Sequence, residues 1–111
     1  MAFKVLFLSH APDADAQEHR CVIETPEYYK LFVVVAKDQK QAIEVCRNLA
    51  KEESIHAILL CPGFTHKDVA EVTEAVGDKV AVSVARGDGP SSRVSMEVLK
   101  REGWFLAEGK E

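Results

Sequence analysis

The stretch that decides the fold runs from residue 29 to residue 60 and begins with YKLFVVVA at Tyr29–Ala36. Three consecutive β-branched valines make this run a strand. DQKQAIEVCRNLA follows at residues 38–50, where apolar side chains recur every three or four positions and predict an amphipathic helix. IHAILL at residues 55–60 is the next strand-forming run. A strand, a helix and a strand in this order predict a right-handed crossover within a parallel sheet.

The same alternation continues toward the C-terminus. Thr65 is placed to cap a helix over residues 65–76, with Asp68 three residues later. KVAVSVA at residues 79–85 is a further strand, and a third helix begins at Pro90 or Ser92. The last apolar run, WFLA at residues 104–107, is expected to form a short strand or a packing tail.

The N-terminal third predicts a strand and a hairpin. FKVLFL at residues 3–8 is expected to be a strand buried on both faces, and residues 9–17 form a polar loop. Residues 21–25 and the strand at Tyr29–Ala36 are expected to form a hairpin, after which Asp38 opens a helix as in a capping box with Gln41. The fold class is therefore α/β, a single domain over residues 1–111. We expect a mostly parallel sheet of four or five strands with three helices, plus a β-hairpin near the N-terminus.

The composition narrows the classes of partner. The chain has 111 residues, of which 47% are hydrophobic and 29% charged, and a net charge of −4. This mild acidity argues against a nucleic-acid partner, and no run reaches the ~20 apolar residues of a membrane helix. The three cysteines form no CxxC pair and read as reduced thiols, so we expect a cytoplasmic protein. No Cys/His cluster has metal-ligand spacing, so no metal site is expected.

Two loops that lead from a strand into a helix carry the main functional hypothesis. They span residues 61–68 and 86–93, and ligands of parallel sheets bind at these carboxyl ends. Glycines, hydroxyls and cations beside a helix N-terminus suit a small molecule bearing phosphate or carboxylate. The candidate ligand-binding residues are Gly63, Phe64, Thr65, Arg86, Gly87, Asp88, Gly89, Ser91, Ser92 and Arg93. The same residue types are also ordinary turn formers. Neither loop matches a P-loop or GxGxxG fingerprint, so the sequence identifies no cofactor.

A second hypothesis makes the protein a Cys/His hydrolase or lyase. Cys61 follows a buried strand and precedes a helix, where a thiol can have a lowered pKa and act as a nucleophile. His66, or His10 at the end of the first strand, is the candidate base. The competing interpretation is a buried cysteine that serves as a small hydrophobe. Whether the protein is an enzyme therefore stays open.

A third hypothesis is a non-enzymatic oligomeric module, and a homo-oligomer is expected. It requires a large apolar surface patch, for which Tyr28, Tyr29, Phe32 and Trp104 are the candidates.

Several short motifs resemble those of a known family. They are Pro12-Asp13-Ala14-Asp15, His19-Arg20, Glu24-Thr25-Pro26 and Cys61-Pro62-Gly63-Phe64. Together they resemble a family of small uncharacterised prokaryotic α/β proteins, a domain of unknown function. The resemblance implies a shared fold and pocket but carries over no catalytic residue. It also implies a role for His19, Arg20 and Glu24 as a lid over the strand ends.

Overall fold

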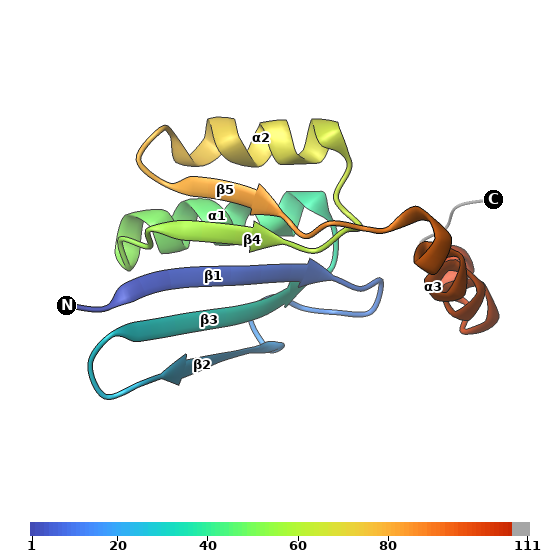
Figure 1. Cartoon of the computed structure of the whole chain (residues 1–111), viewed down its shortest axis with the longest axis horizontal. Coiled ribbons are helices and arrows are strands. Elements are labelled where there is room, and N and C mark those ends of the chain that lie inside the picture. The colour runs from blue at the N-terminus through green and yellow to red at the C-terminus, as the bar shows by residue number, and fades with distance from the viewer. Residues whose placement is uncertain (108–111) are drawn as a thin grey trace.

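A computed structural model describes residues 1–107 as a five-stranded sheet with helices (Figure 1). The strands are β1 (Phe3–His10), β2 (Arg20–Glu24), β3 (Tyr29–Ala36), β4 (Ala57–Leu60) and β5 (Ala81–Val84). The helices are α1 (Gln39–Glu52), α2 (His66–Val76), α3 (Gly89–Arg101) and α4 (Trp104–Ala107). The sheet order is β2-β3-β1-β4-β5, and only β2 and β3 pair antiparallel. The predicted α/β fold with an N-terminal hairpin is confirmed.

β1 is the central strand, and its register fixes which side chains share a face. It pairs in parallel with β3, Leu8 opposite Val34, and with β4, Leu8 opposite Leu60. Directly paired residues point to the same face of a sheet, so these three side chains lie together on one side. All three are at most 1% exposed, which places them in the core.

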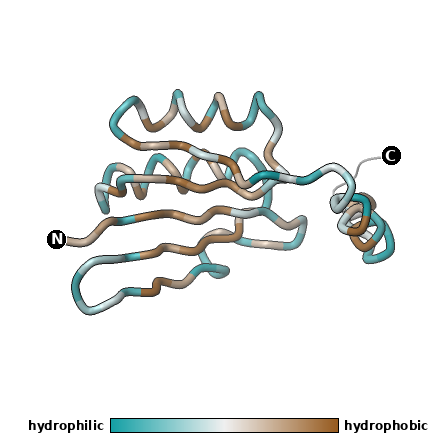
Figure 2. Tube along the Cα trace, in the orientation of Figure 1, coloured by the Kyte–Doolittle hydropathy of each residue, from teal (hydrophilic) through white to brown (hydrophobic). Residues whose placement is uncertain are grey.

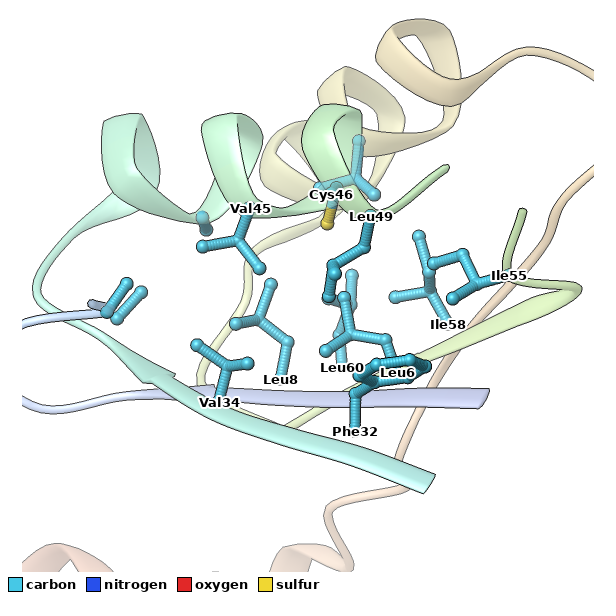
Figure 3. Packing of buried hydrophobic residues seen from close by; sticks show 14 of the residues in the cluster. Leu6, Leu8, Phe32, Val34, Val45, Cys46, Leu49, Ile55, Ile58 and Leu60 are labelled. Atoms are coloured by element: carbon cyan, nitrogen blue, oxygen red, sulfur yellow. The ribbon is translucent and has the colours of Figure 1, made fainter. Parts of the chain in front are cut away.

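α1 and α2 lie on that same face and complete the core. The predicted stripe of α1 is buried: Val45, Cys46 and Leu49 pack over the side chains of β1, β3 and β4 (Figure 3). α2 contributes Val72, which is fully buried, and packs against α1 and β5. Each fully buried aliphatic side chain contributes roughly 1.5–3 kcal/mol, so this layer carries most of the hydrophobic stabilisation.

Among residues 1–107, no helix covers the opposite face of the sheet. Residues 3–8 are predicted to be buried on both faces, but Phe3 is 52% exposed because this cover is missing. Leu59 of β4 and Ile23 of β2 are also exposed on this side. We call it the open face. Figure 2 shows the strands as predominantly hydrophobic, although only one side of them is buried.

The C-terminal helices stand apart from the sheet. α3 lies beyond the carboxyl end of the strands (Figure 1), and none of its residues is buried. Residues 104–107 form the short helix α4, which contacts α3, so the strand, one of the two predicted possibilities, is wrong. Four apolar residues without a partner strand can complete a helical turn locally, whereas a strand needs a neighbour to hydrogen-bond.

Candidate functional site

The carboxyl ends of β1 and β4 form the candidate site. The chain turns from β1 toward β2 and β3, whereas from β4 it turns the other way, toward α2 and β5. Ligands of parallel sheets bind at the carboxyl ends of strands where the chain diverges in this way. His10 is the last residue of β1, and Cys61 is the first residue after β4. Two of the three predicted catalytic residues are therefore neighbours.

Gly63 lies against both of these side chains. A Cβ at Gly63 would be 3.4 Å from His10 Cε1 and 3.6 Å from Cys61 Sγ. Backbone hydrogen bonds hold the loop in this place, because Cys61 N–H donates to Leu8 O at 3.0 Å and Phe64 N–H donates to Cys61 O at 3.3 Å. His10, Cys61 and Gly63 thus surround one small space, which we call the strand-end cluster.

Phe64 packs against the imidazole of His10. Its ring lies 4.3 Å from the ring of His10, centroid to centroid, with the planes inclined by 30°. Phe64 itself is only 5% exposed and belongs to the core. The predicted ligand contact therefore anchors His10 to the core, which fixes the orientation of the imidazole beside the thiol.

Thr65 begins α2 as predicted. Its Oγ1 accepts from Asp68 N–H at 3.1 Å, and its own N–H donates to Asp68 Oδ2 at 3.0 Å, which completes a capping box. The Asp68 carboxylate also offsets the positive end of the helix dipole. The cap contributes to helix stability and uses two of the free amide donors that an anion would need.

The second predicted loop contributes only at its beginning. A Cβ at Gly87 would lie 3.5 Å from Pro62 Cβ, so the two loops touch there. Arg86 Nε donates to Asp88 Oδ1 at 2.7 Å within its own loop, and both side chains are mostly exposed. Ser92, a candidate ligand-binding residue, donates through Oγ to Gly89 O within its own helix. Gly89, Ser91, Ser92 and Arg93 belong to α3, which leads away from the strand-end cluster.

The three cysteines differ in their exposure. Cys21 is exposed, Cys46 is buried and Cys61 is partly exposed. Within residues 1–107, no hydrogen bond joins Cys61 Sγ to a nitrogen of His10 or His66, the bases that we predicted. His66 lies in the first turn of α2 with its side chain exposed. Among residues 1–107, no group of three or more His, Cys, Asp or Glu side chains could hold a metal ion.

The resemblance implies that His19, Arg20 and Glu24 form a lid, but in the structure their segment is part of the scaffold. Arg20 Nε donates to Ala16 O at 2.7 Å, and Asp15 N–H donates to His19 Nδ1 at 2.9 Å. Glu24 pairs with Lys30, at the amino ends of the parallel strands and far from the cluster along the sheet. The three residues therefore do not cover the strand ends together.

Two hollows lined by described residues lie elsewhere. One of about 410 Å³ lies between α1 and α2 and is lined by Ile43, Arg47, Glu71, Glu74 and Ala75. Another of about 60 Å³ lies where residues 15–17 meet α1. The sequence does not predict the hollow between α1 and α2. Helical spacing places Ile43 and Arg47 on one side of α1, but it does not show which helix lies next to that side.

Comparison with known proteins agrees with the resemblance noted in the sequence. No curated protein and no solved structure matches the chain. Within residues 1–107, no helix has both the length and the apolar character needed to cross a bilayer. A family model matches residues 3–99, which include the strand-end cluster, the capped start of α2 and most of α3. The chain belongs to DUF6506, a family of unknown function.

Proposed function

We propose that the protein binds a small anionic molecule, bearing a phosphate or a carboxylate, at the strand-end cluster, where β1 and β4 end. The observation that supports this most is the convergence of His10, Cys61 and Gly63 on one small space. Gly63 leaves that space open, because any larger side chain would lie against the imidazole and the thiol.

The donors around the cluster suit an anion. The capping box engages the amides of Thr65 and Asp68, which leaves those of His66 and Lys67 without an acceptor in the described part of the chain. Free amides at a helix N-terminus bind anions, although the Asp68 carboxylate already offsets part of the dipole. The imidazole of His10 is therefore the side chain on which the proposal depends.

Binding fits this arrangement better than Cys/His catalysis. A nucleophilic thiol needs a base within hydrogen-bond reach, and Cys61 Sγ forms no such bond with a histidine among residues 1–107. Alkylation by iodoacetamide separates the two roles: Cys61 of a binding protein reacts no faster at neutral pH than a model thiol. The free cysteines fit the cytoplasm, where we propose that the protein resides.

Titration with inorganic phosphate, followed by ¹H–¹⁵N NMR, tests the proposal, and titration with acetate tests the carboxylate alternative. We expect saturable shifts of the amides at residues 61–67 and of the His10 ring. Gly63→Val should abolish these shifts, since its side chain fills the cluster while residue 63 stays in an exposed loop.

Gly89→Ala is the matched control, because a Cβ there meets nothing within 4 Å. This variant should keep the shifts of the unmodified chain. Shifts scattered over surface lysines, or shifts that survive Gly63→Val, would contradict the proposed site.

A further inference from the structure

Within residues 1–107, two apolar surfaces have no partner in the structure: the open face of the sheet and one side of α3. We propose that they cover each other between two copies of the chain. In this dimer, α3 and α4 of each copy pack on the open face of the other. The inference is independent of the proposed ligand site.

The open face has the character of an interface core. Pairing registers place on it every second residue of the five strands, and none of these side chains is charged. Phe3 is 52% exposed, Ile23 55% and Leu59 37%. A sheet face that has no charged side chain and exposes several large apolar ones is rare on isolated monomers and marks a site of association.

α3 is amphipathic, yet within residues 1–107 it packs on α4 and not on the sheet. At 100° per residue, its charged residues Arg93, Glu97, Lys100 and Arg101 fall on one side of the helix. The other side carries Val94, Met96 and Val98, which are 56%, 48% and 37% exposed, interspersed with serines. An apolar stripe beside small residues is typical of a helix that packs closely on a sheet.

α3 also needs a partner to be a stable helix. It has 13 residues, and isolated helices of about that length are marginal in water. The first turn of α3 adds little to the stability of the helix, because Asp88 forms no side-chain cap hydrogen bond and Gly89 is a poor helix former. A surface that buries its apolar side is what would stabilise it.

The linker directs α3 away from its own open face. Ala85 N–H donates to Leu60 O at 2.8 Å, which prolongs the pairing of β5 with β4, and Gly87 then packs on Pro62. The chain therefore leaves the sheet along the strand direction, and α3 lies beyond the strand ends (Figure 1). From this position it is presented to a second molecule, and exchange of a terminal element is a common route to dimers.

Dimensions and area agree with this occupant. At 1.5 Å per residue α3 is about 20 Å long, close to the ~26 Å length of β1. The chain exposes 7624 Å², whereas surface scaling gives about 6,100 Å² for a compact monomer of 12.3 kDa. This excess is larger than the ~800 Å² that each partner contributes to an interface of standard size.

Three variants of the full chain test the dimer by sedimentation equilibrium over a range of protein concentrations. We expect the unmodified chain to have twice its mass of 12.3 kDa. Val98→Lys on α3 and Leu59→Lys on the open face should each weaken association by at least about tenfold, since a buried charge would lack a partner. Glu97→Lys, on the charged side of the same helix, should leave the dimer intact.

Isotope-filtered NMR on a mixture of labelled and unlabelled chains locates the contact. We expect intermolecular contacts between methyl groups of α3 and those of Leu59. A monomer, with or without α3 folded onto its own sheet, would overturn the proposal. So would a dimer that lacks these contacts, for example one joined at the β2 edge. This spectrum of the unmodified chain decides the question even if a lysine variant fails to fold.

Discussion

At the scale of single residues, Cys46 shows how burial alone changes a side chain. It lies on the inner side of α1 and is fully buried among aliphatic residues. This desolvation raises the pKa of its thiol from 9.0 to about 12. The thiolate is disfavoured there, so Cys46 serves as a core hydrophobe, as the helical spacing predicted.

The raised pKa predicts how stability depends on pH. Below pH 9 the thiol is protonated in both states, but between pH 9 and about 12 only the unfolded chain loses the proton. The unfolded chain then binds fewer protons, so stability falls as pH rises, by at most about 1.4 kcal/mol per pH unit. Urea unfolding at pH 8–10.5 measures this, a range set by the two pKa values.

The free energy of unfolding of Cys46→Ala should fall less steeply with pH than that of the unmodified chain over that range, because the other groups titrate equally in both proteins. Cys21→Ala is the control, because that thiol is exposed and its loss should not change the slope. Parallel curves for the unmodified chain and Cys46→Ala would show that the buried thiol does not cause the effect.

At the scale of elements, local sequence predicted the helix starts but not every contact made by their residues. Asp38 Oδ1 accepts from Gln41 N–H, as predicted. Gln41 was expected to complete a capping box, yet its Oε1 accepts from Lys37 N–H and from Ala16 N–H. The second partner is 25 residues away, and no pattern within one helix reports such a distance. The hydrogen bond between Ala16 and Gln41 also ties the loop before β2 to α1. Because no local pattern reports this bond, the sequence could not show that the loop is fixed and does not act as a lid.

The capping box of α2 is the element-scale feature that is simplest to test. Thr65→Ala removes the acceptor for Asp68 N–H and should lower the free energy of unfolding by about 1 kcal/mol. Thr65→Ser keeps the hydroxyl and should retain most of that stability. Equilibrium unfolding in urea measures both variants, and equal losses would mean that the hydroxyl is not what stabilises α2.

At the scale of the whole molecule, the alternation of strands and helices sufficed to predict the sheet, because each crossover is constrained by chirality. It also brought His10 and Cys61 to one edge, since parallel strands end together. The position of α3 could not be predicted. Its spacing shows which side is apolar but not which surface covers that side, and the predicted site residues on α3 are separated from the cluster for this reason.

The proposed dimer predicts that thermal stability depends on protein concentration. Association stabilises the folded state by mass action, so a hundredfold increase in concentration should raise the Tm by about 3–8 °C. Differential scanning calorimetry of the unmodified chain and of Val98→Lys makes the comparison. The variant should show a smaller rise of the Tm with concentration, because its association is weaker. A flat response of the unmodified chain would contradict the association.

The order of elements along the chain also determines the order in which they are synthesised. Among residues 1–107, the core cluster and the side chains packed against it end at Val82. Everything that builds the sheet and its two covering helices is thus translated before α3, and small domains fold in seconds or less. The residues of the whole sheet therefore precede α3 on every nascent chain. In the proposed dimer, the surface that receives α3 is thus synthesised ahead of the helix that covers it.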